Sequence, residues 1–406
     1  DKLKGFDVTG VSGAFNIVTD HIIATSGNKS EVIHTWTFTL TFVNLGTDQS
    51  NNENSTLNID VVLQKDKIPT TIADFCSNGD NLGNCIVNYY NGLNTASNIY
   101  YHDLNLTNGA EDNSYRFAGA DPNNYVCFGS DEATCPTENL YRIIGVIDGK
   151  VKLIHAYGAT TDMLGTNEGY TKTYQEAYGR NSSYYKGNGD LTKIGTYKWN
   201  KTRNNTWSTS TTNTINLNTN YLTYLDSKNT KWKTMIDDTT WYVGGMSWSN
   251  LQLSNAKTAY NYEVGANKDA STTVNAKIGL MYVSEYYYAA TSDYWTLPRF
   301  NLSGNDCRVA KNDNWLYTGL YEWTLSRNSD FSTGAFIVHV NGFVGAYGVG
   351  NQDGYAVRPS FSLSSSIKFT SGEGTAVNPI RIKLWLGDYA CLGRKADWRT
   401  VLIEPL

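Results

Sequence analysis

The chain has 406 residues, of which 40% are hydrophobic and 13% aromatic, so it carries ample material for a packed core and exceeds the length that one domain usually organises. Its formal net charge of −5 and its lack of any Lys/Arg run exclude the basic footprint of a nucleic-acid-binding protein. No stretch approaches the roughly 20 apolar residues that cross a bilayer, so we expect no direct membrane span.

The first part of the chain alternates apolar and polar residues with the period of a half-buried strand. One run lies within residues 31–45, and a second follows the polar loop Gly46–Asn54. We therefore expect residues 1–66 to form an immunoglobulin-like β-sandwich module. The apolar positions that carry this prediction are Trp36, Phe38, Leu40, Phe42, Leu57, Ile59, Val61 and Leu63.

Residues 67–111 lack a clear period and predict a partly helical linker, with helical segments interrupted around Gly79–Gly83. We place the larger domain at 112–383 and treat residues 384–406 as a C-terminal extension. The fold class expected for the whole chain is β-rich α+β, because Asn, Thr, Ser and Gly dominate its polar residues and only 17% are charged.

The six cysteines form an even set with two closely spaced pairs and no CxxC metal spacing. We predict the bridges Cys76–Cys85, Cys127–Cys135 and Cys307–Cys391, which imply an oxidising compartment and an extracellular or cell-surface location. Reduced buried thiols in a cytosolic protein are the alternative, since Cys also serves as a small core residue.

Within the larger domain, the dipeptide Asp148-Gly149 separates two apolar runs, Leu140–Ile147 and Lys150–Ile154, and predicts a hairpin with a type I′ turn. Short helices are expected around Asn220–Leu225 and Thr230–Ile236. Further strands are expected at Lys277–Val283, Gly334–Val349 and Ala356–Leu363, connected by long loops.

Catalytic and metal-binding motifs are not recognisable. No two of the five histidines have the i, i+4 spacing of a zincin, and Gly245-Met246-Ser247-Trp248-Ser249 lacks the last glycine of a nucleophile elbow. The acids Asp237 and Asp238 are better explained as solvated loop residues than as a glycosidase pair. Asp/Asn clusters at 108–113 and 121–124 have calcium-ligating side chains but not the spacing of an EF-hand, so calcium stays an open alternative that we do not predict, and we predict no other metal and no cofactor.

Several segments resemble uncharacterised surface proteins of gut bacteria of Gram-positive lineage, over most of residues 100–383. They are Asn113–Ala120, Asn124–Gly129, Asn139–Val146, Lys277–Ser284, Glu322–Ser326 and Gly354–Pro359. Glu322-Trp323-Thr324 followed by Gly354-Tyr355-Ala356-Val357-Arg358 is similar to the core motif of the formylglycine-generating-enzyme branch of the C-type lectin fold. The resemblance implies a C-type-lectin-like domain at 112–383.

The enzymatic activity of that branch does not carry over, because its reactive cysteine pair has no match: Cys307 and Cys391 flank the motif widely. The same branch contains the variable proteins of diversity-generating retroelements, whose ligand face lies between the two motifs. We expect Glu322, Trp323 and Arg358 to hold the fold, since Trp323 can fill a core and a buried carboxylate or guanidinium needs a partner.

The segment 334–349 predicts a hairpin whose turn decides its faces. With a two-residue turn at Asn341-Gly342, both faces of the hairpin would have a mixed set of side chains. With the three-residue turn Val340-Asn341-Gly342, one face is uniformly apolar. In the second case the opposite face and the following loop present a ligand-binding surface. The predicted ligand-binding residues are Ile337, His339, Phe343, Tyr347, Asn351, Gln352 and Asp353. The alternative is that these side chains pack beneath a neighbouring loop.

The sequence therefore favours an extracellular ligand-binding or adhesion protein, not an enzyme, that recognises a glycan or a protein through a loop-rich surface. The first alternative is a structural subunit that self-associates into a surface filament or pilus through strand exchange. The second is a glycan-active enzyme, because aromatic-lined clefts also suit sugars.

Overall fold

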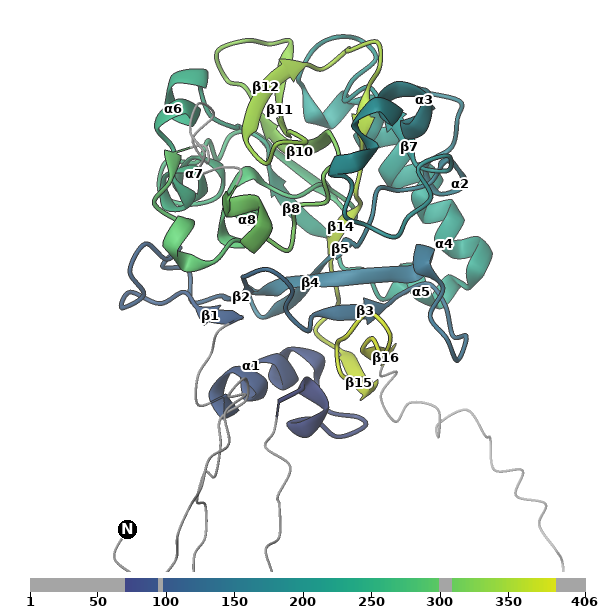
Figure 1. Cartoon of the computed structure of the whole chain (residues 1–406), viewed down its shortest axis with the longest axis vertical. Helices are drawn as coiled ribbons and strands as arrows, with labels where there is room; N and C mark the ends of the chain where they lie inside the picture. Colours follow the sequence, from purple (N-terminus) through teal and green to yellow (C-terminus); the bar gives the residue numbers. More distant parts are fainter. Residues whose placement is uncertain (1–69, 94–97, 299–308, 385–406) are drawn as a thin grey trace, which may run out of the picture. The chain divides into compact units, whose positions relative to one another are not determined.

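The computed structural model describes residues 70–93, 98–298 and 309–384. The predicted module 1–66, the extension beyond residue 384, and Cys307 and Cys391 lie outside these ranges. In the described ranges the chain is β-rich with mixed α and β content (Figure 1). None of the helices there is long and apolar enough to cross a membrane.

The first sheet is six-stranded and antiparallel, in the order β1-β2-β4-β5-β14, with β3 also pairing β4. Its long hairpin β4–β5 turns at Asp148 and Gly149, which have φ of 49° and 71°, so both residues take the left-handed conformation that a type I′ turn requires. The prediction of this hairpin is confirmed. The strands are β1 (Ile99–Tyr101), β2 (Tyr115–Phe117), β3 (Tyr125–Cys127), β4 (Leu140–Ile147), β5 (Lys150–His155) and β14 (Ser360–Ser362).

The second sheet is also six-stranded, in the order β12-β11-β10-β13-β7-β6. Strands β10 and β13 pair in parallel through Glu322 and Ala356, while the other neighbours are antiparallel. The strands are β6 (Tyr170–Thr173), β7 (Gly195–Tyr197), β10 (Glu322–Arg327), β11 (Gly334–Val338), β12 (Val344–Gly348) and β13 (Tyr355–Ala356). Two small sheets complete the β structure: β8 (Thr239–Tyr242) with β9 (Thr273–Ala276), and β15 (Ile367–Ser371) with β16 (Arg381–Leu384).

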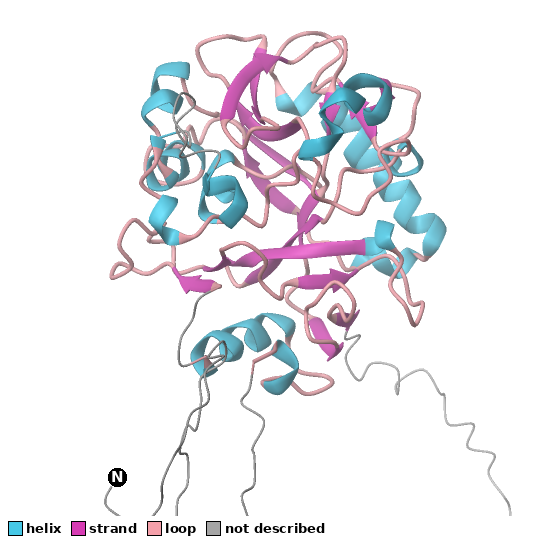
Figure 2. Cartoon of the chain, in the orientation of Figure 1, coloured by secondary structure: helices cyan, strands magenta, loops and turns pink. Residues whose placement is uncertain are grey.

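Short helices flank the sheets (Figure 2). The helices are α1 (Leu82–Gly92), α2 (Thr161–Leu164), α3 (Tyr174–Tyr178), α4 (Leu222–Lys228), α5 (Thr230–Thr234), α6 (Trp248–Leu253), α7 (Ala256–Glu263) and α8 (Val283–Tyr288), with a π-helix at Thr212–Tyr221. Short 3₁₀ helices lie at Ile72–Asp74, Thr137–Asn139, Gly179–Tyr184, Trp207–Thr209, Ser292–Tyr294 and Lys311–Asp313.

Two expectations about the chain's organisation are wrong. Residues 98–111 are not a linker, because β1 pairs with β2 and Ile99 lies in the same core as the two large sheets. Helix α1 joins that core through buried Leu82 and Ile86. The predicted strand at 277–283 is instead an extended segment with a single bridge at Gly279, and Val283 already begins α8. Burial of an apolar run does not by itself distinguish a strand from such a segment.

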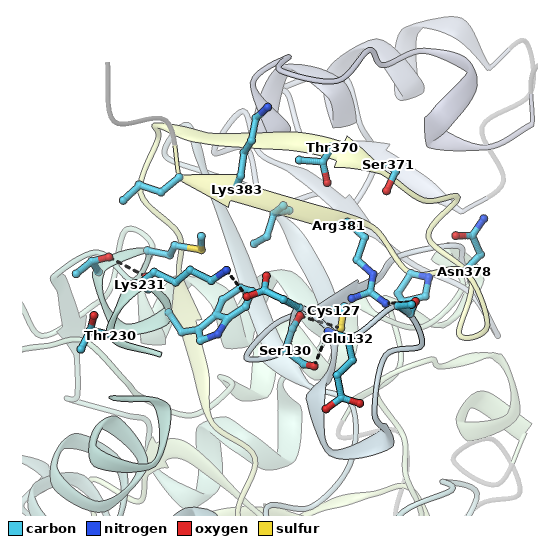
Figure 3. A pocket seen from close by; sticks show the side chains of 18 of the residues that line it. Cys127, Ser130, Glu132, Thr230, Lys231, Thr370, Ser371, Asn378, Arg381 and Lys383 are labelled. Carbon is cyan, nitrogen blue, oxygen red and sulfur yellow. Dashed lines mark hydrogen bonds and ion pairs between the residues drawn. The ribbon is translucent and has the colours of Figure 1, made fainter. Parts of the chain in front are cut away.

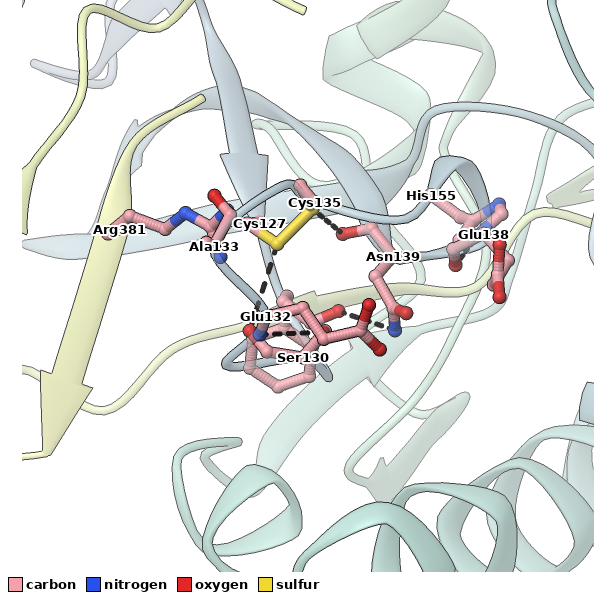
Figure 4. Close-up of a disulfide and its surroundings, with 10 residues drawn as sticks. Cys127, Ser130, Glu132, Ala133, Cys135, Glu138, Asn139, His155 and Arg381 are labelled. Carbon is pink, nitrogen blue, oxygen red and sulfur yellow. Dashed lines mark hydrogen bonds between the residues drawn. A yellow bond between two sulfur atoms is a disulfide. The ribbon is translucent and has the colours of Figure 1, made fainter. Parts of the chain in front are cut away.

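Two of the predicted disulfides are present. Cys76–Cys85 ties the loop before α1 to that helix, and Cys127–Cys135 closes the loop that follows β3. Figure 4 shows the second bridge, together with Arg381 from β16 reaching the carbonyl of Ala133 inside the loop, at 2.9 Å. The bridge and this hydrogen bond hold the loop against the β15–β16 sheet.

Candidate functional site

The β11–β12 hairpin has the three-residue turn that sorts its faces. Val338 pairs with Val344, and the His339 N–H donates to the Phe343 carbonyl at 2.8 Å. Gly342 has φ of 89°, the left-handed position of this turn. Two tyrosine hydroxyls bond the main chain of the turn. Tyr286 donates to the Gly342 carbonyl at 2.9 Å, and Tyr317 donates to the Val340 carbonyl. The predicted register is confirmed.

The inner face of the hairpin belongs to the core. Phe336, Val338 and Val344 are buried, and Ala346 is half-buried. On the outer face four rings are half-buried, from β12, from the turn and from the residue before β10. We refer to Tyr321, His339, Phe343 and Tyr347 as the aromatic face.

Ring contacts fix the four side chains of the aromatic face: three contact one another, and the fourth packs on a buried ring. His339 and Phe343 stack with centroids 4.2 Å apart and planes 17° apart. Tyr321 meets His339 edge-on at 4.6 Å, and Tyr347 packs against the buried ring of Tyr355 at 5.7 Å. Such edge-on and stacked contacts fix ring orientation, so the face presents rigid aromatic edges and faces to solvent.

Ile337 corrects the sequence prediction, because its side chain is fully buried and cannot contact a ligand. It lies on the same face as His339 but between Trp323 of β10 and Gly345 of β12. A Cβ placed on Gly345 would meet Tyr347 at 3.0 Å and Phe343 at 3.3 Å, so these rings already fill the space beside Ile337. The alternation of side chains along a strand predicts which face a residue lies on, but not how much of its surface neighbouring rings cover.

The predicted loop residues Asn351, Gln352 and Asp353 form a polar rim beside the aromatic face, and each has a different role. Asn351 is half-buried and fixes the loop, donating from Nδ2 to the Tyr355 hydroxyl at 3.1 Å and accepting from the Asp353 N–H at 2.9 Å. Asp353 forms an ion pair with Lys172 of β6 at 2.8 Å. Gln352 is exposed at the crest of the loop. Gln352 therefore offers an amide to a partner, while Asn351 positions the loop.

The aromatic face is uncharged at neutral pH. Burial lowers the pKa of His339 to about 4, so its imidazole is neutral. Its Nδ1 accepts from the Asn341 N–H at 3.2 Å, which leaves the hydrogen of the neutral ring on Nε2. Burial also raises the pKa of Tyr321. Stacking, apolar contact and neutral hydrogen bonds are the interactions that this surface can make.

Directly beneath the face, a buried ion pair joins the two motifs. Arg358 Nε donates to Glu322 Oε1 at 2.6 Å, and Arg358 Nη2 donates to the Leu316 carbonyl at 2.8 Å. Burial raises the pKa of Glu322, and the Arg358 guanidinium opposes that shift. Trp323, also buried, donates its indole N–H to the Tyr197 carbonyl at 2.7 Å. All three residues lie in the core, where the sequence reasoning put them.

A groove of about 850 Å³ lies elsewhere on the molecule, between the Cys127–Cys135 loop, helix α5 and the β15–β16 sheet (Figure 3). Trp232, Met235 and Leu384 give it an apolar lining, and Lys231 pairs with Asp131 at its border. The sequence reasoning missed this groove. Its one sequence signal is the short disulfide loop, but the elements that face that loop lie about 100 and 250 residues further along the chain.

The acids considered for calcium or catalysis are engaged by cations. Asp112 pairs with Arg116 at 2.6 Å and Asp121 with Arg142 at 3.1 Å. Asp237 pairs with Lys150 at 2.5 Å. Among the residues that the structure describes, no group of three or more His, Cys, Asp or Glu side chains could hold a metal ion.

No protein-family model, no curated protein and no solved structure matches this chain.

Proposed function

We propose that this chain is an extracellular ligand-binding or adhesion protein whose C-type-lectin-like domain recognises a glycan or a protein through the aromatic face. The observation that carries the proposal is the set of four half-buried rings beside polar loop residues, three in contact with one another and the fourth, Tyr347, packed on the buried Tyr355. Rigid aromatic side chains lose little conformational entropy on binding and are enriched where proteins make strong contacts.

The arrangement of the two motifs supports the C-type-lectin-like fold. Glu322 begins β10, and Ala356 in β13 pairs with it in parallel, although the two are 34 positions apart (356 − 322). The hairpin β11–β12 is inserted between them in sequence and lies at the edge of the same sheet. The motifs thus form the base from which the inserted hairpin presents its outer face.

The two disulfides support an extracellular or surface location, since such bridges persist in oxidising compartments. The uncharged character of the aromatic face favours neutral ligands: sugar rings that stack on Phe343 and Tyr347, or an apolar patch on a protein. The paired Lys172 and Asp353 on the rim then add orientation more than affinity.

The test is a variant with His339, Phe343 and Tyr347 all replaced by Ala, applied to an array of neutral glycans and a panel of host surface glycoproteins. The matched control is Phe331→Ala, which removes an equally large ring that is 62% exposed outside the aromatic face. We expect binding by the wild type and the control and at least a tenfold loss in the triple variant, with folding checked by circular dichroism. Equal binding by all three folded proteins would refute the proposal.

A further inference from the structure

Along the outer edge of β16, some main-chain groups have no hydrogen-bond partner among the residues that the structure describes. Ile380, just before the strand, donates its N–H to the Tyr125 carbonyl at 2.9 Å and accepts from the Cys127 N–H at 3.0 Å. Its main chain therefore points toward β3. Because successive residues of a strand direct their N–H and C=O to opposite edges, Ile382 and Leu384 point to the same side as Ile380.

The partner strand confirms this assignment. Phe369, which lies opposite Ile382 in β15, directs its N–H to the Asp80 carbonyl and its own carbonyl to the Gly79 N–H, both at 2.9 Å. Phe369 and Ile382 are thus a non-hydrogen-bonded pair of the ladder, with main chains facing away from each other. Within the described ranges, no hydrogen bond is formed by the Ile382 main chain on its outer edge.

Strand β3 leaves this edge too early to cover it. After Cys127 the chain turns away, and the Phe128 N–H donates instead to the Asn139 carbonyl at 2.9 Å. Ile382 and Leu384 line the groove, and so does Cys127, the last residue of β3. An unpaired strand edge beside an open groove is a template for an added strand.

The lining of the groove specifies the chemistry of that strand. Because Trp232 and Met235 are almost fully buried, Leu384 and the exposed Val377 offer the apolar contacts for alternate side chains of an extended peptide. Two cations, Lys231 and Arg381, lie at the groove beside the carboxylates Asp131 and Glu132, while the Lys383 side chain points away from them. Lys231 is paired with Asp131, whereas Arg381 and Lys383 donate to neutral oxygens of Ala133 and Asn78.

We propose that this groove is a second binding site, separate from the aromatic face, that takes an extended peptide strand of a partner protein by β-strand addition to β16. The strand has apolar residues at alternate positions and at least one acidic residue. Hydrogen bonds to the Ile382 and Leu384 main chains supply the alignment, and the groove walls select the side chains.

The experiment pans a displayed library of random 12-residue peptides against the full oxidised chain. The selected peptides are synthesised and scanned by N-methylation, one amide at a time. We expect at least a tenfold loss of affinity at alternate amides only, because an added strand uses every second N–H. Slower hydrogen exchange at the Ile382 amide in the complex is the second expected result.

Two variants complete the test. Ile382→Pro removes the edge N–H at a position where an edge strand tolerates proline, and Ile382→Ala removes the side chain but keeps the N–H. We expect at least a tenfold weaker affinity for the proline variant than for the alanine variant. The proposal is overturned if no peptide is selected, if N-methylation has no period of two, or if the Ile382 amide is already protected in the free monomer. Concentration-dependent protection without peptide also overturns it, because the strand would then come from a second copy.

Discussion

The aromatic face and the β16 groove present two different kinds of surface on one domain. On the β11–β12 hairpin the two strands pair with each other, and the contacts proposed there are made by the side chains of the outer face. At β16 one edge of the main chain is unpaired within the described part of the chain, and the side chains around it come from α5, a disulfide loop and a hairpin. In our proposals the first surface selects ligands by ring geometry, whereas the second aligns an extended backbone through main-chain hydrogen bonds and selects its side chains through the groove walls.

The two surfaces also differ in what holds them. The aromatic face rests on the buried Trp323 and the Glu322–Arg358 pair, in the centre of the second sheet. The groove depends on a covalent bridge and on the hydrogen bond from Arg381 to Ala133. Changes to the core should therefore affect the first surface, and changes to the bridge should affect the second.

The largest effect is expected from Trp323→Ala. Removing a fully buried indole leaves a cavity and an unpaired Tyr197 carbonyl, and such substitutions cost about 3–5 kcal/mol. Urea denaturation of the whole chain measures this loss. An unchanged midpoint would show that Trp323 does not support the sheet. Phe331→Ala, at an exposed position, is the control that should leave the midpoint in place.

A smaller loss is expected from replacing Cys127 and Cys135 together by Ser. Opening a loop of this size costs about 2–3 kcal/mol by loop-closure entropy. The matched control is the Cys76/Cys85 double Ser variant, whose loop is one residue longer. Both should lose similar stability, but only the first should speed hydrogen exchange in residues 128–134 beside the groove. Equal exchange there in both variants would show that the bridge does not shape the groove.

Gly345→Ala should have an effect of about 1 kcal/mol, confined to the aromatic face. Its new Cβ would lie 3.0 Å from Tyr347, so that ring must move away from the face. Gly348→Ala on the same strand is the control, because the nearest atom to its Cβ lies 4.0 Å away. Thermal melting and the ring signals of Phe343 and Tyr347 in NMR spectra would measure the difference. Identical spectra for the two variants would contradict the packing described for the face.

The sequence predicted what local chemistry controls. Asp148-Gly149 and Val340-Asn341-Gly342 set their hairpins through left-handed backbone positions, and the loop lengths between cysteines set two disulfides. It could not predict how deeply each side chain is buried. Ile337 and His339 lie on the same face of the hairpin, but neighbouring rings cover Ile337. It could not predict the groove either, since that depends on where β3 stops pairing relative to β16, and contacts between residues so far apart leave no local period.

The smallest effect is expected in the pH dependence of stability, where the contribution of His339 in the aromatic face can be told apart from that of the buried His155. The pKa of His339 is lowered to about 4 in the folded chain, against an ordinary value of 6.5. Between these values the unfolded chain binds the proton and the folded chain does not, so His339 lowers stability as the pH falls from about 6.5 towards 4. His339→Gln should therefore flatten the dependence of the melting temperature on pH in this window. The change is modest because the ring is half-exposed and water screens its charge. Since His155 is fully buried between the carbonyls of Tyr157 and Glu138, its own acid response should persist in the variant. An unchanged pH profile would mean that the His339 imidazole titrates like one in water, and that the stacked pair with Phe343 is open to solvent.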